Sequence, residues 1–340
     1  MAKNWHINES FLDNLPNHNG SMVVNGCPGS GKTLMALWKA KEIEENNIET
    51  YYFIVPNKVQ KHYIDTGFEE LGLSQTQLVH HWEWKNQLHQ SNADCIFVDD
   101  AHHYTKIELN ELINATDKFI ILLGNWMGLS DVCQDNEKFI NAEELANQFQ
   151  LKLTHLVLSY ALSKKVARVA DSVNNFKDLE SRCRNEGANK PFLVKASNWF
   201  QQLDFIMDTI DERGHTDVGI LFPDNKLVMA ADEYYKVKKF RVEAKYDISH
   251  PENSKYNIDF NSSNPKLMTY HNAQGLRFET VVLPYCSEEH FRKEFFTALT
   301  RTNENLYILY SGELTHFLKD IPSELMEKIE IGDIDSDTVF

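Results

Sequence analysis

The stretch that decides the fold spans eight residues and reads Gly26-Cys27-Pro28-Gly29-Ser30-Gly31-Lys32-Thr33. It fits the pattern G-x-x-x-x-G-K-[ST], whose glycines let consecutive backbone N–H groups curl around a phosphate. An apolar strand is predicted before it, over 21–24, and a helix after it, over 34–45. The positive end of that helix would point at the same anion. The setting therefore predicts a phosphate-binding loop that opens an α/β domain.

The side chains of this loop indicate its chemistry. Lys32 is expected to reach the β- and γ-phosphates of a bound nucleotide, and Thr33 to ligate Mg²⁺. A chance match to a glycine-rich turn is the alternative, and the flanking strand and helix argue against it. Cys27 is expected to be a small filler, with a redox-sensitive thiol as the alternative. The sequence thus predicts that residues 26–33 bind ATP together with Mg²⁺.

A second motif that could take part in catalysis lies about seventy residues after the loop. An apolar strand predicted over 94–98 is followed directly by Asp99 and Asp100. In a nucleotide hydrolase the first acid holds the magnesium shell, and the second orients or deprotonates water. Two solvated turn acids are the alternative. Because the pair follows a phosphate loop, we expect Asp99 beside the metal and Asp100 in catalysis.

Composition places the chain among globular proteins and excludes several other classes. Its 340 residues suffice for about two domains, and 42% hydrophobic and 25% charged residues are ordinary proportions. No apolar run reaches the ~18 residues of a membrane-spanning helix, and the N-terminus lacks the apolar core of a secretory signal. The five cysteines are odd in number and form no CxxC pair. This usage argues against a disulfide framework or zinc site and suits a reducing cytoplasm.

The net charge of −16 is unevenly distributed along the chain. Residues 1–150 carry 10 Lys and Arg against 21 Asp and Glu, which gives −11. Residues 151–340 carry 24 against 29, which gives −5, and include all eight arginines. An acidic chain does not bind nucleic acid through bulk charge. Such binding would need a local basic groove, or a partner that supplies one.

Short apolar runs alternate with helical stretches over the whole chain, which predicts an α/β fold. Further strands are predicted over 51–55, 118–123, 153–158, 218–222, 266–269, 281–283 and 306–310. Further helices are predicted over 163–176, 196–213 and 291–300, and the polar stretch 225–263 is predicted to be irregular. We expect one domain over 1–150, a second over 151–325, and an acidic tail over 326–340.

In this order, the segments resemble the motifs of the UvrD/Rep-like superfamily 1 helicases, over roughly residues 7–320. Residues 26–33 match the family's motif I, and Asp99-Asp100-Ala101-His102 stands where the family has Asp-Glu-x-Gln. Residues 158–163 resemble its Asn-Tyr-Arg-Ser segment. Residues 269–278 resemble Thr-x-His-x-x-Lys-Gly-Leu-Glu-Phe, and 298–301 read Ala-Leu-Thr-Arg as in the family.

The resemblance implies two tandem RecA-like domains with parallel sheets, without large inserted domains, and ATP held between them. It also implies that Gly275 and Arg301 meet the γ-phosphate, Arg301 as an arginine finger. Single-stranded nucleic acid, DNA rather than RNA, would cross both domains. Aromatic and histidine side chains that match family contact positions are expected to meet the bases: His81, Trp82, Trp84 and His271. Packing of the two tryptophans in the core is the alternative.

Several positions depart from the family pattern. Asp100 replaces the usual Glu, and its carboxylate is one methylene shorter. The segment 124–128 lacks the acid and the glutamine of the third motif, and Ala161 replaces an arginine that touches the γ-phosphate. Phe11 replaces a base-reading glutamine. In 269–278, Gln274 and Arg277 replace Lys and Glu. These departures predict nucleotide binding with slow turnover.

Three functions remain open from the sequence. The first is a helicase-like ATP hydrolase acting with single-stranded nucleic acid and an accessory protein such as a nuclease, in DNA repair or anti-phage defence. The second is a nucleotide-gated regulatory or scaffold subunit that binds ATP and controls such a partner. The third is a P-loop kinase, which would make the motifs at 269–278 and 298–301 coincidental. None of the three implies a membrane.

Overall fold

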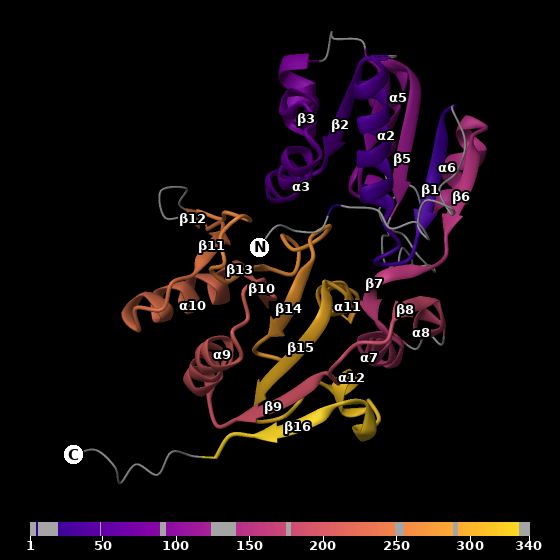
Figure 1. Cartoon of the computed structure of the whole chain (residues 1–340). Coiled ribbons are helices and arrows are strands. Elements are labelled where there is room, and N and C mark those ends of the chain that lie inside the picture. The colour runs from indigo at the N-terminus through magenta and orange to yellow at the C-terminus, as the bar shows by residue number, and fades with distance from the viewer. Residues whose placement is uncertain are drawn as a thin grey trace. The chain divides into compact units, whose positions relative to one another are not determined.

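Figure 1 shows the computed structural model of the chain, which describes residues 5, 20–47, 49–88, 93–123, 141–174, 178–248, 255–287 and 292–332. The chain divides into two compact units, one ending at Ala161 and the other beginning at Leu162. Each unit is built on its own parallel or mostly parallel sheet. None of the described helices combines the length and the apolar character that a membrane span requires.

The sheet of the first unit is entirely parallel, with strand order β3-β2-β4-β5-β1-β6. Its strands are β1 (Met22–Gly26), β2 (Tyr51–Val55), β3 (Leu78–His80), β4 (Ala93–Val98), β5 (Thr116–Leu123) and β6 (Lys152–Leu156). The connecting helices are α2 (Lys32–Asn46), α3 (Lys58–Leu71), α4 (His81–Glu83), α5 (Lys106–Asn114) and α6 (Ala142–Phe149). Short helical turns cover Gln75–Gln77, Trp84–Leu88 and Ala101–His103.

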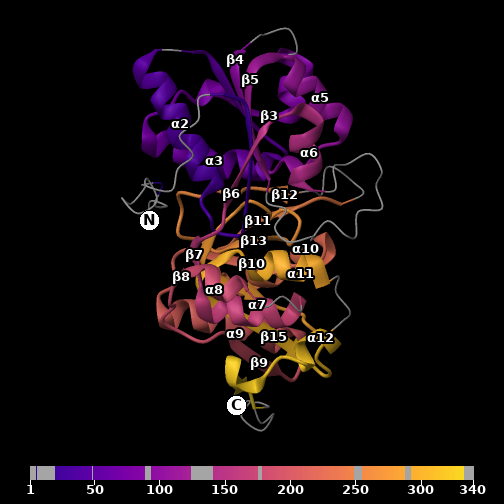
Figure 2. The same ribbon diagram turned by 90° about the vertical axis from the view of Figure 1, so that its right-hand side faces the viewer.

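Helices cover both faces of this sheet, α2 and α3 on one and α5 and α6 on the other (Figure 2). The central strands are therefore buried on both sides and read as continuous apolar runs. Strand β1 is buried at every position, and β4 at every position except Asp94. Because parallel strands all end at one edge, the residues that follow β1, β2 and β4 gather there.

The second unit contains an eight-stranded sheet in the order β12-β11-β13-β10-β14-β15-β9-β16, parallel except for the β11–β12 pair. Its strands are β9 (Phe192–Ala196), β10 (Val218–Phe222), β11 (Glu243–Tyr246), β12 (Lys255–Tyr256), β13 (Lys266–Thr269), β14 (Phe278–Leu283), β15 (Thr302–Ser311) and β16 (Glu327–Glu330). Its helices are α7 (Lys164–Asn174), α8 (Leu179–Arg182), α9 (Trp199–Arg213), α10 (Asn225–Val237), α11 (Arg292–Leu299) and α12 (His316–Lys319), with a short turn at Ser323–Leu325. Strands β7 (Ser159–Ser163) and β8 (Cys183–Asn185) form a separate two-stranded sheet.

The expected α/β fold class is confirmed, and the parallel sheets agree with the tandem RecA-like architecture that the resemblance implied. The prediction that 225–263 is irregular is wrong, because α10, β11 and β12 form there. The division between the units falls eleven residues after position 150, since β6 pairs with β1 and extends the first sheet. The expected acidic tail begins instead as a strand, with β16 pairing in parallel with β9.

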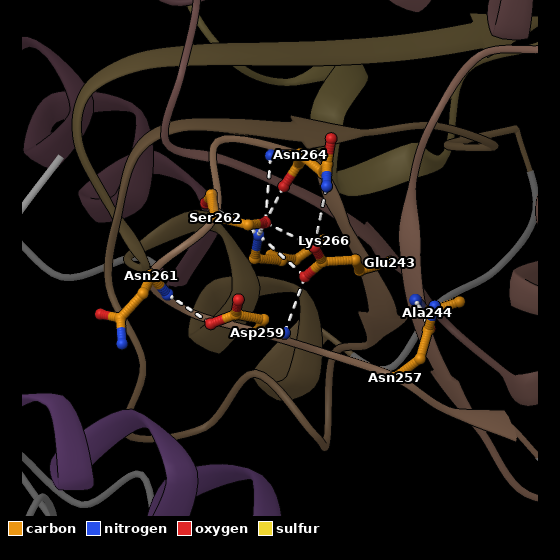
Figure 3. Close-up of polar contacts among 8 residues, drawn as sticks. All are labelled: Glu243, Ala244, Asn257, Asp259, Asn261, Ser262, Asn264 and Lys266. Carbon is orange, nitrogen blue, oxygen red and sulfur yellow. Dashed lines mark hydrogen bonds and ion pairs between the residues drawn. The ribbon is translucent and has the colours of Figure 1, made fainter.

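A polar cluster closes the loop between β12 and β13 (Figure 3). Glu243 and Lys266 begin neighbouring strands, and their side chains form a buried ion pair of 3.0 Å. Glu243 also accepts hydrogen bonds from Ser262, from the Asn264 side chain at 2.9 Å and from the Asp259 backbone at 2.7 Å. The Lys266 ammonium donates to the Asn264 carbonyl at 2.6 Å. The charges are therefore compensated by a complete set of partners.

Candidate nucleotide-binding site

The phosphate loop follows β1 and leads directly into α2. Gly31, the N-cap of α2, has a φ of 85°, a left-handed conformation that favours glycine. A Cβ on Gly26 would lie 2.5 Å from Ser30 Oγ and 2.8 Å from the Leu156 carbonyl oxygen. The two glycines thus allow the backbone to curl tightly in front of the helix N-terminus. This is the arrangement that can present N–H groups to an anion.

The Lys32 side chain lies over this loop. Its ammonium donates to the Gly26 carbonyl at 2.9 Å, to the Cys27 carbonyl at 3.3 Å and to Ser30 Oγ at 3.4 Å. A lysine held there carries its charge at the place where the glycine pattern would hold a phosphate. The Cys27 thiol is buried and donates to the Val157 carbonyl at 3.6 Å. This burial agrees with the filler interpretation of Cys27.

Thr33 and Asp99 meet beside the loop. The Thr33 hydroxyl, in the first turn of α2, donates to Asp99 Oδ2 at 2.9 Å. Asp99 is 1% exposed, and burial together with the neighbouring Asp100 raises its pKa, while the Thr33 hydrogen bond acts in the opposite direction. A hydroxyl and a carboxylate are hard oxygen ligands of the kind that Mg²⁺ prefers. The donor set therefore fits a magnesium ion.

Asp100 follows in an unusual backbone conformation. Its φ of 45° is left-handed, which aspartate tolerates better than most residues, and its N–H donates to Asp99 Oδ1 at 3.0 Å. Gln60, which the sequence analysis did not single out, donates from its side-chain amide to both acids. It lies in the helix after β2, which pairs with β4 in the sheet, and no local sequence pattern marks it.

The segment expected to match the family's fourth motif contacts the phosphate loop. The Tyr160 N–H donates to the Gly29 carbonyl at 3.0 Å. Together with the Cys27 contact, this bond ties the loop to residues 157–160. Those residues lead directly into the second unit. Of the expected departures, Phe11 and residues 124–128 lie outside the described residues.

The motif residues of the second unit are joined to one another. Gly275 closes a turn after β13 with a φ of 77°. The Arg301 guanidinium donates to the Thr297 carbonyl at 2.9 Å and to Thr300 Oγ1 at 3.2 Å. The Arg301 carbonyl accepts a hydrogen bond of 3.0 Å from the Phe278 N–H. The segments 269–278 and 298–301 are thus connected within one unit.

The four expected nucleic-acid contacts differ in exposure. Trp82 is 57% exposed, and His271 is also exposed. Trp84 is fully buried in the core that α5 and α6 cover. His81 is buried edge-on against Tyr104, with ring centroids 4.9 Å apart. In this structure, Trp82 and His271 are the two of the four that a base can reach.

Comparison with protein families places two domains on the chain. Residues 15–127 match the family described as an AAA domain. Residues 266–309 match the UvrD-like helicase C-terminal domain. The first match includes the phosphate loop and the acid pair, and the second includes the segments at 269–278 and 298–301. Among curated proteins, no significant match was found.

Several solved structures are similar to the chain. The C-terminal domain of a possible DNA helicase from Lactobacillus plantarum WCFS1 is 17% identical with a TM-score of 0.39, over 51% of this chain and 98% of that domain. The PRRSV helicase is 12% identical with a TM-score of 0.47, over 89% of this chain and 54% of its own. Arterivirus nonstructural protein 10, a helicase, is 13% identical with a TM-score of 0.45, over 90% of this chain and 62% of its own.

Proposed function

Because the chain is a UvrD/Rep-like superfamily 1 helicase-like protein, with an AAA-type P-loop domain and a UvrD-like helicase C-terminal domain, we propose that it hydrolyses ATP in response to single-stranded nucleic acid. The observation that carries this proposal is the 2.9 Å bond between Thr33 and Asp99, formed beside a lysine held over the loop. This bond joins the helix after the phosphate loop to the acid pair, and so it supports a shared role of these residues in binding Mg·ATP.

The residues take the following roles in the proposed reaction. Residues 26–31 cradle the phosphates, and Lys32 neutralises their charge. Thr33 and Asp99 hold the magnesium ion, which when bound would neutralise developing charge on the phosphates. Asp100 orients the attacking water. Arg301 supplies a cation to the transferred phosphoryl group, and the Gly275 turn approaches the same group.

Nucleic-acid binding in this proposal uses local contacts instead of bulk charge. A base can stack on the exposed ring of Trp82, and Lys85 lies 5.9 Å from that ring. His271, in the turn after β13, is the contact proposed for the second unit. Since the chain carries a net charge of −16, an accessory protein such as a nuclease is proposed to complete the binding surface. DNA is proposed over RNA, and the cytoplasm as the location.

The test is phosphate release from ATP, with and without a poly-dT strand. We expect the strand to raise the rate of the wild-type protein, and Lys32→Ala to abolish both basal and stimulated release, because the lysine contacts the transferred phosphate. Lys152→Ala, which changes an exposed lysine of β6, is the matched control. A Lys32→Ala protein that hydrolyses ATP normally would contradict the assignment of the site.

A second candidate is a nucleotide-gated regulatory subunit that controls a nuclease. Ala161, at a position where the family has an arginine, and the shortened acid Asp100 favour it, because both changes slow turnover. This candidate predicts that ATP promotes assembly with the partner while poly-dT leaves phosphate release unchanged. Measuring both quantities on the same protein separates the two functions.

A further inference from the structure

A buried glutamine joins the two acids at the end of β4. Gln60 lies in the first turn of α3, where the Asn57 side chain caps the helix by accepting the Gln60 N–H at 2.8 Å. The side-chain nitrogen of Gln60 donates to Asp99 Oδ2 at 3.2 Å and to Asp100 Oδ2 at 3.0 Å. An amide nitrogen has two N–H donors, so a single group can serve both carboxylates at once.

The two carboxylates determine which end of the amide faces them. An amide oxygen in the same place would be repelled by both acids, so Oε1 of Gln60 must point elsewhere. Gln60 is 1% exposed, and its Oε1 is buried without a hydrogen-bond partner among the residues that the structure describes. An unsatisfied buried acceptor costs about 1–3 kcal/mol. The amide therefore donates to both acids while its own oxygen stays unpaired. This arrangement lowers the stability of the fold, so stability alone does not explain it.

The short side chain of Asp100 suggests what the contact with Gln60 does. Asp100 stands where the family usually has Glu, and a carboxylate one methylene shorter depends more on what orients it. Its backbone is left-handed, and the amide nitrogen that is bonded to its carboxylate is also bonded to Asp99. We propose that Gln60 is a positioning residue of the hydrolytic site, which fixes the short Asp100 carboxylate relative to Asp99. This inference rests on the proposed ATP hydrolysis.

The first test compares kcat and KM for ATP in the wild type and in Gln60→Met, which keeps the side chain's size but removes both donors. We expect kcat to fall by about 10²-fold, the typical effect of a small misplacement of a reacting group. KM, measured at saturating Mg²⁺, should stay within about threefold, because the residue does not contact the substrate. Gln75→Met, at an exposed position of the same unit, is the matched control and should change neither quantity.

A compensating pair of variants separates positioning from a general structural role. Gln60→Asn shortens the amide arm by one methylene and should also lower kcat. Adding Asp100→Glu lengthens the side chain that carries the carboxylate by one methylene, so the contact can form again. We then expect kcat to recover at least tenfold, which is on the order of half of the activation free energy lost. A double variant no faster than Gln60→Asn, or a Gln60→Met protein with wild-type kcat, would overturn the proposal.

A binding measurement keeps this inference distinct from the proposed hydrolysis. A fluorescent ATP analogue is titrated at a series of Mg²⁺ concentrations. Because Gln60 is also bonded to Asp99, Gln60→Met should need on the order of tenfold more Mg²⁺ to reach tight binding, whereas Gln75→Met should match the wild type. If the wild type binds but does not hydrolyse ATP, the proposed hydrolysis fails, and an unchanged Mg²⁺ requirement would then refute the role of Gln60 as well.

Discussion

Two neighbouring tryptophans show how much individual side chains can differ in role. Trp84 has no exposed surface and belongs to the core beneath α5, whereas Trp82 is 57% exposed. Their match to family contact positions implies the same function for both. The difference in burial follows from helical geometry, because residues two positions apart in a helical stretch lie on nearly opposite sides of it and only one side faces the core.

We expect opposite outcomes when each tryptophan is replaced by alanine. Trp84→Ala should lower the free energy of unfolding by about 3–5 kcal/mol, as measured in urea, because it leaves a large cavity. Trp82→Ala should leave stability nearly unchanged but weaken single-strand binding by about 1–3 kcal/mol, measured by fluorescence anisotropy of poly-dT. Ile107→Ala, at a position that is 65% exposed, should change neither. Equal losses of stability in both tryptophan variants would contradict this account.

The residues of the candidate site could be predicted where their function depends on a local pattern. The pattern of residues 26–33 specifies which side chains form the loop, and Asp99 follows a strand that is apolar throughout its buried part. Gln60 could not be found in the same way, because it is 39 positions away from Asp99 in the chain and contacts it only through the pairing of β2 with β4. A single glutamine in a polar helix carries no pattern of its own.

At the scale of single elements, short apolar runs were predicted best as strands. Residues 51–55, 218–222 and 266–269 form strands with the predicted bounds. The helix α10 was missed, although Asp224 caps it by accepting the Leu227 N–H at 2.9 Å and Val228, Ala231 and Tyr235 face the core. The apolar stripe is blurred in the sequence, because Leu227, Met229 and Tyr234 are only partly buried and the apolar Val237 is exposed.

The ion pair between Glu243 and Lys266 gives a prediction for the elements it joins. Both side chains are buried, so removing one partner leaves the other charge uncompensated. Glu243→Leu and Lys266→Met should each lower the free energy of unfolding by about 3–5 kcal/mol in urea, whereas the double variant should lose clearly less than the sum. Exposed Lys195 and Glu330, paired at 2.6 Å, are the control, and their replacement should lower the free energy of unfolding far less, because solvent screens an exposed pair. Additive losses at the buried pair would show that the charges do not interact.

The helical turn that carries His81 predicts a pH dependence of stability. Burial lowers the pKa of His81, and Glu108, 3.8 Å away, only partly offsets this effect. The unfolded chain therefore takes up a proton at a higher pH than the folded protein. Stability is complete above the unfolded pKa of about 6.5 and decreases as the pH falls below it.

We expect His81→Phe to reduce the loss of unfolding free energy between pH 7 and pH 5, measured by urea titration at each pH. The slope should not vanish, because burial also lowers the pKa of His62 and His80. A steeper slope in His81→Phe would show that the sign of the linkage is reversed.

At the scale of the whole molecule, two units must cooperate if the resemblance to helicases extends to mechanism. The motif residues are divided between them, with the loop and the acid pair in one unit and Arg301 in the other. Composition alone could indicate two units, but it placed the division at residue 150. The sixth strand of the first sheet is half polar, so the sequence does not show that it continues the first unit.

Arg301→Ala should separate binding from turnover in the whole protein. Its cation is expected to act on the transferred phosphoryl group, so kcat should fall by about 10³–10⁵-fold. The affinity for a fluorescent ATP analogue should stay within about threefold, because Lys32 and the loop bind the phosphates from the other unit. Arg241→Ala is the control, since it removes an arginine of the same unit at an exposed position. A large loss of affinity in Arg301→Ala would place this arginine in ground-state binding instead.

The position of β1 in its sheet has a consequence for how the protein is made. The strand that leads into the phosphate loop pairs with β5 and β6, whose last residue is 130 positions downstream of Gly26. A ribosome therefore releases the loop long before its neighbours exist, and contacts so distant along the chain form late in folding. The nascent chain should therefore bind nucleotide only after Tyr160 has emerged from the ribosome. Prematurely terminated products would carry the motif without the ability to sequester ATP.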